Sequence, residues 1–243
     1  MKPGVPGNRP TPASPGPQLP LALRYPPDQR LDTFVGAAAG TIEQLQALAD
    51  GGSDDWLYLA GPGGVGKTHL LLAACAVAEA SGRRAAFLPL AAAAGRLRDA
   101  LQALEGSDLL ALDGLEAIAG NRDDEVALFD AHNRARAVGS RISYAARATP
   151  DALGIGLPDL RSRLSQCSRI SLQPLDEQGR REVLRQRARR RGWVLEETAL
   201  DWLLKRVERD MAGLTALLDR LDRASLAAQR RITVPFLRQL LGG

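Results

Sequence analysis

An eight-residue run in the first third of the chain combines glycines, a lysine and a hydroxyl residue. It follows a strand-like stretch and precedes a helix-like one, and it reads Gly61, Pro62, Gly63, Gly64, Val65, Gly66, Lys67 and Thr68. Glycines let backbone N–H groups converge on phosphate oxygens, and the start of a helix adds a favourable dipole. Lys67 would neutralise β- and γ-phosphates, and Thr68 would bring a hydroxyl to Mg²⁺. The run therefore predicts a nucleotide site that uses Mg²⁺.

A second candidate for the Mg²⁺ shell is an aspartate at the end of an apolar run. Leu109–Asp113 reads Leu-Leu-Ala-Leu-Asp, which is typical of a buried strand with an acidic residue at its carboxyl end. We expect Asp113 to hold Mg²⁺ with Thr68; the alternative is an aspartate in an ordinary strand-to-loop turn. Many ATPases place another acidic residue directly afterwards. Here that position is Gly114, and the next carboxylate is Glu116.

The elements that must position these residues can be read from the pattern of apolar runs. Short runs bounded by turn residues are typical of buried parallel strands, and their alternation with helices implies right-handed crossovers. The sequence thus predicts an α/β fold with a parallel, doubly wound sheet. Strands are expected at Trp56–Ala60, Ala85–Leu90, Leu109–Asp113, Arg141–Ala145 and Ile170–Leu172, and helices at His69–Ala80, Ala94–Leu104 and Asp123–Val138.

After Pro174 the pattern is helical throughout, which predicts a small all-helical domain behind the α/β domain. Residues 1–17 hold six prolines and few apolar side chains, which predicts a disordered tail. The expected division is a tail at 1–17, a short segment at 18–30, an α/β domain at 31–175 and a helical domain at 176–243. The helices expected in the last of these are Glu177–Arg191, Glu197–Arg209, Met211–Gln229 and Pro235–Leu241.

Composition limits the class of protein. The 243 residues are 45% hydrophobic and 25% charged, enough for a substantial core. No apolar run reaches the ~18 residues of a membrane-spanning helix, and the N-terminus lacks the apolar region of a secretion signal. The two cysteines have no disulfide or zinc spacing. We therefore expect a cytoplasmic protein with no membrane partner.

The positive charge of the chain is weak evidence for a nucleic-acid partner. The net charge is +4, yet only three of the 32 basic residues are lysine, so a solvated, arginine-rich surface explains it. We expect the same of the arginine run on the first helix of the helical domain (Arg185, Arg187, Arg189, Arg190 and Arg191). His69 and His132 are expected on helix surfaces, and Trp56 in the core.

With the loop, Asp113 and the helical C-terminal region in view, the chain from about Gln18 onwards resembles the AAA+ ATPases of the DnaA family. Within them it is similar to the Hda branch, DnaA-related regulators that inactivate the replication initiator. The closer likeness rests on three stretches: residues 18–23 (Gln-Leu-Pro-Leu-Ala-Leu), 156–164 (Gly-Leu-Pro-Asp-Leu-Arg-Ser-Arg-Leu) and 221–230 (Leu-Asp-Arg-Ala-Ser-Leu-Ala-Ala-Gln-Arg).

The resemblance implies an AAA+ domain with a helical lid, ADP or ATP as ligand, and a role as a negative regulator of replication initiation with DnaA as partner. AAA+ proteins usually assemble head to tail, so a homo-oligomer is also plausible for such a chain.

The segment at 18–23 is similar to the hexapeptide by which Hda docks onto the sliding clamp, the β subunit of DNA polymerase III. An extended, proline-constrained strip loses little entropy on binding. Gln18 would hydrogen-bond at one end while Leu21 and Leu23 fill an apolar cleft, and Leu19 would belong to the same contact. DNA would then be reached indirectly, through the clamp. The alternative is an apolar strip that packs on its own domain.

The family places an arginine finger near the end of the α/β domain, where it reaches the nucleotide of a neighbouring subunit. Arg163 matches that position, in Ser162-Arg163-Leu164, and Arg161 is a weaker substitute. A guanidinium there would stabilise charge on a transferring phosphoryl group. The alternative for Arg163 is an ordinary surface salt bridge.

Three positions that assist hydrolysis in the family look depleted: Gly114 after Asp113, Ala145 with Ala146 at the end of the fourth strand, and Ala212 in the lid. The chain is therefore expected to bind nucleotide but hydrolyse it poorly alone, and to act on the ATP of DnaA. Two alternatives stay open. One is a helicase-loader-type AAA+ ATPase that hydrolyses its own ATP on single-stranded DNA, and the other is a clamp-tethered scaffold.

Overall fold

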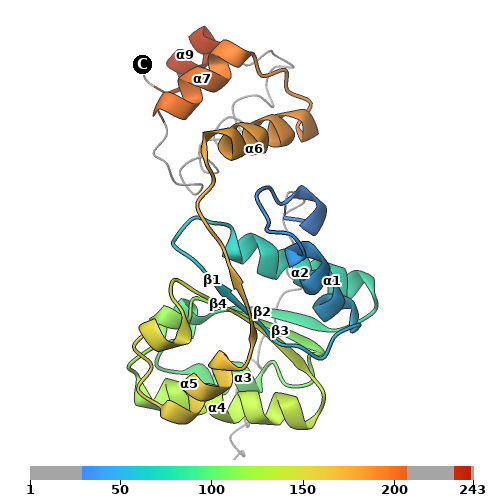
Figure 1. Cartoon of the computed structure of the whole chain (residues 1–243), viewed down its shortest axis with the longest axis vertical. Helices are drawn as coiled ribbons and strands as arrows, with labels where there is room; N and C mark the ends of the chain where they lie inside the picture. The colour runs from blue at the N-terminus through green and yellow to red at the C-terminus, as the bar shows by residue number, and fades with distance from the viewer. Residues whose placement is uncertain (1–28, 207–232, 242–243) are drawn as a thin grey trace, which may run out of the picture.

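The computed structural model describes residues 29–206 and 233–241 of the chain (Figure 1). The segment at 18–23, the expected helix Met211–Gln229 with Ala212, and the stretch at 221–230 lie outside the described residues. Within the described part, no helix is long and apolar enough to cross a bilayer.

The centre of the fold is a five-stranded sheet with the order β2-β3-β4-β1-β5. Every neighbouring pair of strands is parallel, which confirms the predicted doubly wound α/β fold. The strands are β1 Leu57–Ala60, β2 Ala85–Pro89, β3 Leu109–Asp113, β4 Arg141–Ala146 and β5 Ser168–Ser171.

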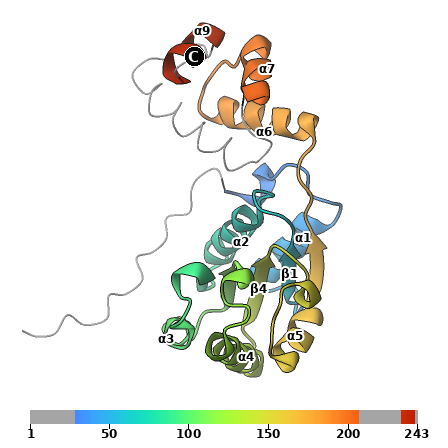
Figure 2. The same cartoon turned by 90° about the vertical axis from the view of Figure 1, so that its left-hand side faces the viewer.

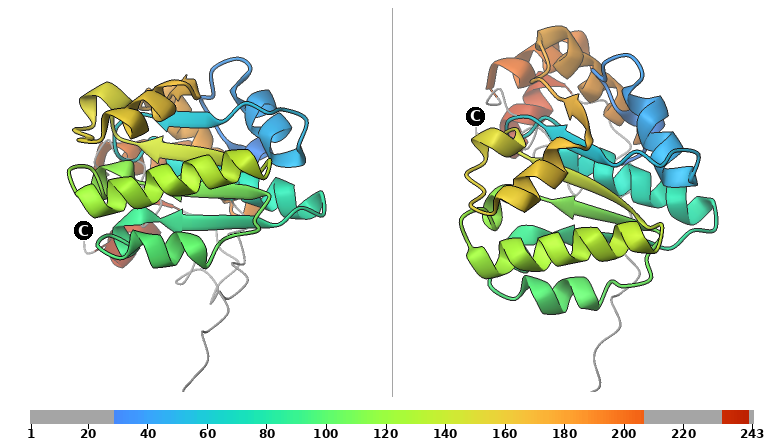
Figure 3. Two further views of the ribbon diagram at one scale, coloured as in Figure 1. Left: turned by 90° about the horizontal axis from the view of Figure 1, so that it is seen from below. Right: turned by 60° about the horizontal axis from the view of Figure 1, so that its bottom comes forward.

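Helices cover both faces of the sheet (Figures 2 and 3). Alternate strand residues point to opposite faces, so Leu57 and Leu59 pack in one core cluster while Tyr58 and Ala60 pack in the other. One face carries α1 Thr41–Asp50 and α2 Lys67–Ala80, and the other carries α3 Leu97–Gln102, α4 Arg122–Ala137 and α5 Pro158–Ser165. Short 3-10 turns complete this domain: η1 Leu31–Thr33, η2 Leu90–Ala92, η3 Leu115–Ala117 and η4 Pro150–Ala152.

Some boundaries differ from the sequence prediction. The helix expected at 94–104 is confined to α3, because Gly95 adopts a left-handed φ of 79° after the turn η2. Strand β5 begins at Ser168 rather than Ile170. It is an edge strand with one buried side chain, so its exposed residues do not form the apolar run that predicts a strand. Helix α1, bounded by left-handed Gly40 and Gly51, was not predicted.

The C-terminal region is helical, as predicted. Its described helices are α6 Glu177–Arg190, α7 Glu197–Arg206 and α9 Val234–Leu241. They share a separate small core, built from Leu184, Ala199, Leu200, Leu203 and Leu237.

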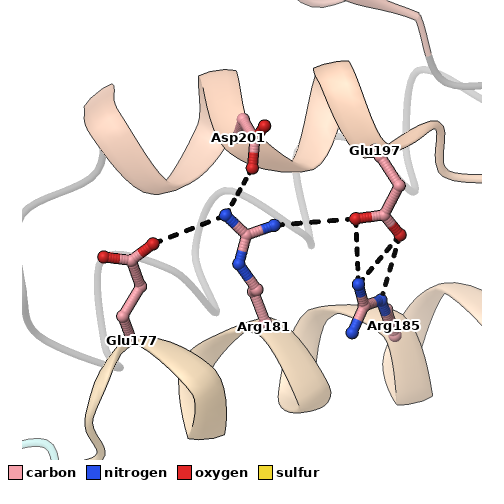
Figure 4. A network of polar contacts seen from close by, with 5 residues as sticks. All are labelled: Glu177, Arg181, Arg185, Glu197 and Asp201. Carbon is pink, nitrogen blue, oxygen red and sulfur yellow. Dashed lines mark hydrogen bonds and ion pairs between the residues drawn. The ribbon is translucent and has the colours of Figure 1, made fainter.

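An ion-pair network fastens α6 to α7 (Figure 4). Arg181 contacts Asp201 and lies 3.6 Å from Glu197 and 3.4 Å from Glu177, while Arg185 Nη2 is 2.9 Å from Glu197. Exposed pairs contribute little individually, but a shared network fixes the relative orientation of two helices. Arg185, expected on a solvated face, therefore has a structural partner on the neighbouring helix.

The prediction for His132 was wrong. Its side chain is only 2% exposed, on the face of α4 that meets the sheet. His132 Nδ1 lies 2.9 Å from the Tyr144 hydroxyl, and the imidazole packs 4.4 Å from the Trp56 ring centroid. Burial, followed by the charges of Arg163 and Arg136, lowers the pKa of His132 to about 4. His132 is thus neutral in the folded protein near pH 7.

This lowered pKa predicts a pH-dependent loss of stability. Between pH ~6.5 and pH 4, His132 is protonated in the unfolded chain but stays neutral in the folded chain. The free energy of unfolding therefore decreases as the pH falls through this range. At pH 5 the loss attributable to His132 is about 2 kcal/mol. Urea unfolding of the wild type and His132→Gln at pH 7 and pH 5 checks this. We expect a smaller pH effect in the variant, and an equal effect would contradict the prediction.

Candidate functional site

The candidate site lies where the carboxyl ends of β1 and β3 meet one edge of the sheet. The loop Gly61–Thr68 leaves β1 and runs into α2, whose first helical residue is Lys67. In register, Ala60 lies beside Ala146 of β4, and Asp113 lies beside Ala145. The parallel sheet therefore brings the loop and Asp113 to the same edge. Strand β3 is not the neighbour of β1 that the sequence predicted, because β4 lies between them.

Two loop glycines are required by close approach. A Cβ atom on Gly66, whose φ is 95°, would lie 2.5 Å from Cε2 of Phe34. A Cβ on Gly61 would lie 2.4 Å from the carbonyl oxygen of Leu172, beyond β5. The loop is thus packed between Leu172, the residue after β5, and Phe34, the residue after η1.

We expect Gly66→Ala to destabilise the protein more than an otherwise comparable glycine substitution. Gly82 is the matched control, because its φ of 76° is also left-handed but a Cβ there meets no atom within 4 Å. Left-handed strain costs each alanine variant ~1 kcal/mol, and the Phe34 clash adds about 1–3 kcal/mol at Gly66. Equal free energies of unfolding for the two variants, measured with urea, would contradict this account.

Lys67 is folded back onto its own loop. Its ammonium Nζ donates to the carbonyl oxygens of Gly61, at 2.6 Å, and Pro62, at 2.7 Å. Burial lowers the pKa of Lys67, while the nearby carboxylates of Glu116 and Asp113 act in the opposite direction. The ammonium is therefore positioned at the mouth of the loop, where a phosphate would replace the carbonyl partners.

Thr68 and Asp113, the two residues expected to hold Mg²⁺, are joined by a hydrogen bond. Thr68 Oγ1 donates to Asp113 Oδ2 at 2.5 Å. Burial raises the pKa of Asp113, and the Thr68 hydrogen bond and the Lys67 charge lower it. A hydroxyl and a carboxylate oxygen suit Mg²⁺, which takes oxygen ligands and keeps phosphates or waters in its remaining positions. Among the described residues there is no cluster of three or more His, Cys, Asp or Glu that could hold a metal ion.

Two further charged side chains lie near this edge: Glu116, which the sequence analysis noted without assigning it a role, and Arg147, which it did not consider. Gly114 adopts a left-handed φ of 84° and leads into η3, where Glu116 reaches the residue that follows β4. Glu116 accepts from the backbone N–H of Arg147 and pairs with its Nε, both at 3.1 Å. The Glu116 and Arg147 charges are close enough to affect the pKa of Lys67. The one sequence signal for a charge near Lys67 was Glu116, two positions after Gly114.

Ala145 and Ala146 are fully buried, one in each of the two cores, and alanine offers no polar side-chain group. The polar residue expected at the end of the fourth strand is therefore absent from those two positions. The charged group nearest to them in sequence is the guanidinium of Arg147.

Arg163 lies in the last turn of α5, and its side chain is half-buried. Its charge contributes to the lowered pKa of His132 on α4, after the larger effect of burial. No ion pair joins Arg163 to a carboxylate among residues 29–206 and 233–241. Nor does a hydrogen bond or ion pair link the Arg163 guanidinium to Lys67, Thr68 or Asp113 in this part of the chain.

Comparisons with known proteins agree with this architecture. Residues 176–241 match the family described as "Hda, lid domain". Domain III of the replication initiation protein DnaA from Thermotoga maritima is 20% identical, with 90% of this chain and 97% of that chain covered and a TM-score of 0.74. AMPPCP-bound DnaA from Aquifex aeolicus is 22% identical over 81% of this chain and 65% of that chain, with a TM-score of 0.66. The RuvB Holliday junction branch migration motor of Thermotoga maritima is 18% identical, with 88% and 71% covered and a TM-score of 0.63.

These likenesses identify the fold of the chain and the type of its C-terminal region. At 18–22% identity the structural matches show a shared fold, and the lid match adds the family of the C-terminal region. The chain thus joins a domain with the fold of DnaA domain III to a C-terminal region, residues 176–241, that matches the Hda lid family.

Proposed function

We propose that this chain is a negative regulator of DNA replication initiation that promotes hydrolysis of DnaA-bound ATP by supplying Arg163 in trans. The observation that carries the proposal is an Hda-type lid on a DnaA-like AAA+ fold whose α5 arginine has no carboxylate partner in the described residues. A guanidinium presented in this way can stabilise the charge on a phosphoryl group in transfer. DnaA is the partner that this account requires.

The chain's own nucleotide would be ADP or ATP, held by Gly61–Thr68. Lys67 would exchange its two carbonyl contacts for phosphate oxygens, and the Thr68–Asp113 pair would hold Mg²⁺. The AMPPCP complex of the Aquifex aeolicus protein supports nucleotide binding by this fold. Without an acidic residue at Gly114 or a polar one at Ala145, we expect slow intrinsic hydrolysis.

The proposed route to DNA is a sliding clamp. We propose that residues 18–30 bind the clamp, with Gln18, Leu19, Leu21 and Leu23 in the contact. Replacing Gln18, Leu21 and Leu23 together by alanine is expected to abolish clamp binding and leave nucleotide affinity unchanged, because the segment lies outside the loop that would hold nucleotide. Surface plasmon resonance on immobilised β clamp measures this. As a control for lost apolar surface, Val138→Ala, 75% exposed at the end of α4, should bind like the wild type, and clamp binding retained by the triple variant would refute the assignment.

A helicase-loader-type ATPase is the second candidate. The charged pair Glu116–Arg147 near Lys67 and the fold shared with RuvB favour it. It requires hydrolysis of the chain's own ATP that single-stranded DNA accelerates. An ATPase assay of the isolated protein with and without single-stranded DNA therefore separates the two functions.

A further inference from the structure

Glu125 is a buried carboxylate that is held by backbone N–H groups. It lies in the first turn of α4 and is 1% exposed. Oε1 accepts from the backbone N–H groups of Gly120, at 2.7 Å, and Gly156, at 2.9 Å, and Oε2 accepts from that of Leu157, at 2.7 Å. No ion pair involves Glu125 within the part of the chain that the structure describes. Three amide dipoles therefore carry the stabilisation of this carboxylate.

The three donors come from two loops that are distant in sequence. Gly120 ends the loop that follows Asp113 and η3. Gly156 and Leu157 lead into α5, and Leu157 is the residue before its first turn, with no side-chain cap of its own. Glu125 thus ties the loop after the candidate Mg²⁺ ligand to the start of the helix that carries Arg163.

The position of Arg163 depends on that tie. Helix α5 has eight residues, and Arg163 lies six residues after Leu157, about 9 Å along the axis. Besides the carboxylate, Leu160 and Leu164 anchor the helix from one face. An apolar face allows a short helix to slide or tilt, whereas a hydrogen-bonded carboxylate fixes its end. A displacement of ~1 Å at a group that must meet a transition state can cost about 100-fold in rate.

We propose that Glu125 is a positioning residue that sets the place of Arg163 for its action in trans. The expected effect on the rate of hydrolysis rests on the proposed function. The expected effect on the position of α5 rests on the three hydrogen bonds of Glu125 alone. Glu125 would touch neither nucleotide. It acts through α5.

The neighbouring residue offers a matched control. Asp124 is also buried, at 2% exposure, and accepts from the backbone N–H groups of Gly95, at 2.7 Å, and Leu97, at 3.2 Å. Asp124 therefore accepts hydrogen bonds from the backbone at the start of α3, as Glu125 does at the start of α5. A general loss of a buried carboxylate would affect both variants, whereas a specific effect on Arg163 would appear only at Glu125.

The test compares Glu125→Gln with Asp124→Asn in the full chain. Glutamine keeps the size of the side chain but turns an NH₂ group toward an amide N–H that had an acceptor. We expect Glu125→Gln to lower the maximal rate of hydrolysis of DnaA-bound ATP about tenfold or more, in the presence of loaded clamp. The concentration of protein that gives half of the maximal stimulation, and the affinity for ADP, should stay unchanged. Asp124→Asn should retain most of the stimulation.

Amide hydrogen exchange supplies a readout that does not need stimulation. Glu125→Gln should accelerate exchange at residues 156–165 about tenfold or more, and Asp124→Asn should accelerate it at residues 95–102 instead. Wild-type stimulation retained by Glu125→Gln, or lost equally in both variants, would overturn the kinetic role. Unchanged exchange at 156–165 would overturn the positioning itself. If the wild type fails to stimulate hydrolysis, the proposed function fails, and the exchange experiment still decides whether Glu125 fixes α5.

Discussion

Arg163→Ala is expected to reduce the stimulated hydrolysis of DnaA-bound ATP by about 100-fold or more. Arginine fingers contribute ~10³–10⁵ to the rate of nucleotide hydrolysis, because the guanidinium neutralises charge that develops on the transferring phosphoryl group. Arg163 makes no ion pair with a carboxylate in the described residues, so its removal leaves no charge unpaired there. Folding, clamp binding and nucleotide affinity should therefore be preserved. Single-turnover release of phosphate from preloaded DnaA measures the effect.

Arg161→Ala is the matched control for this experiment. Arg161 lies on the same helix, is exposed, and also forms no ion pair in the described part of the chain. It should stimulate DnaA like the wild type. Loss of stimulation in Arg161→Ala with retention in Arg163→Ala would move the finger to the other position, and retention in both would leave a clamp-tethered scaffold as the better explanation.

Lys67→Ala should weaken nucleotide binding by about 100-fold or more, equivalent to about 3 kcal/mol. The ammonium is only slightly exposed and already lies at the loop, so it would meet the phosphates without rearrangement of the helix. Alanine removes that charge and also leaves the carbonyls of Gly61 and Pro62 without their donor. Fluorescence titration with a labelled ADP measures the change.

The control for a general loss of positive charge is Lys205→Ala. Lys205 is exposed on α7, in the lid, and we expect ADP affinity within about twofold of the wild type. Circular dichroism should show both variants folded. Undiminished ADP affinity in a folded Lys67→Ala protein would contradict the assignment of the loop.

The sequence was sufficient for features that depend on neighbours along the chain. The glycine pattern at 61–68 and the apolar run that ends at Asp113 are local, and parallel strands then bring their carboxyl ends together. Helix α4 carries its own start signal, since Asn121 accepts from the N–H groups of Asp123 and Asp124. The start of β5 was predicted two residues too late, because an edge strand needs apolar side chains on only part of its length.

Features that depend on contacts across the fold could not be predicted. His132 is polar and lies on an amphipathic helix, so its burial is explained only by its partners Trp56, just before β1, and Tyr144, within β4. Glu116 and Arg147 are 31 residues apart and meet because η3 turns back toward the end of β4. Glu125 meets the start of α5 across a similar separation. In each case a polar side chain is satisfied by a partner that no local pattern identifies.

The central claim is that this protein acts on a nucleotide held by DnaA. The most direct test is the hydrolysis of ATP preloaded on DnaA, with and without this protein, on DNA that carries loaded sliding clamp. The account predicts an acceleration that requires the clamp, is lost in Arg163→Ala and is not reproduced by clamp alone. No acceleration of DnaA-bound ATP, accompanied by DNA-stimulated hydrolysis of this protein's own ATP, would contradict the account and establish the helicase-loader function instead.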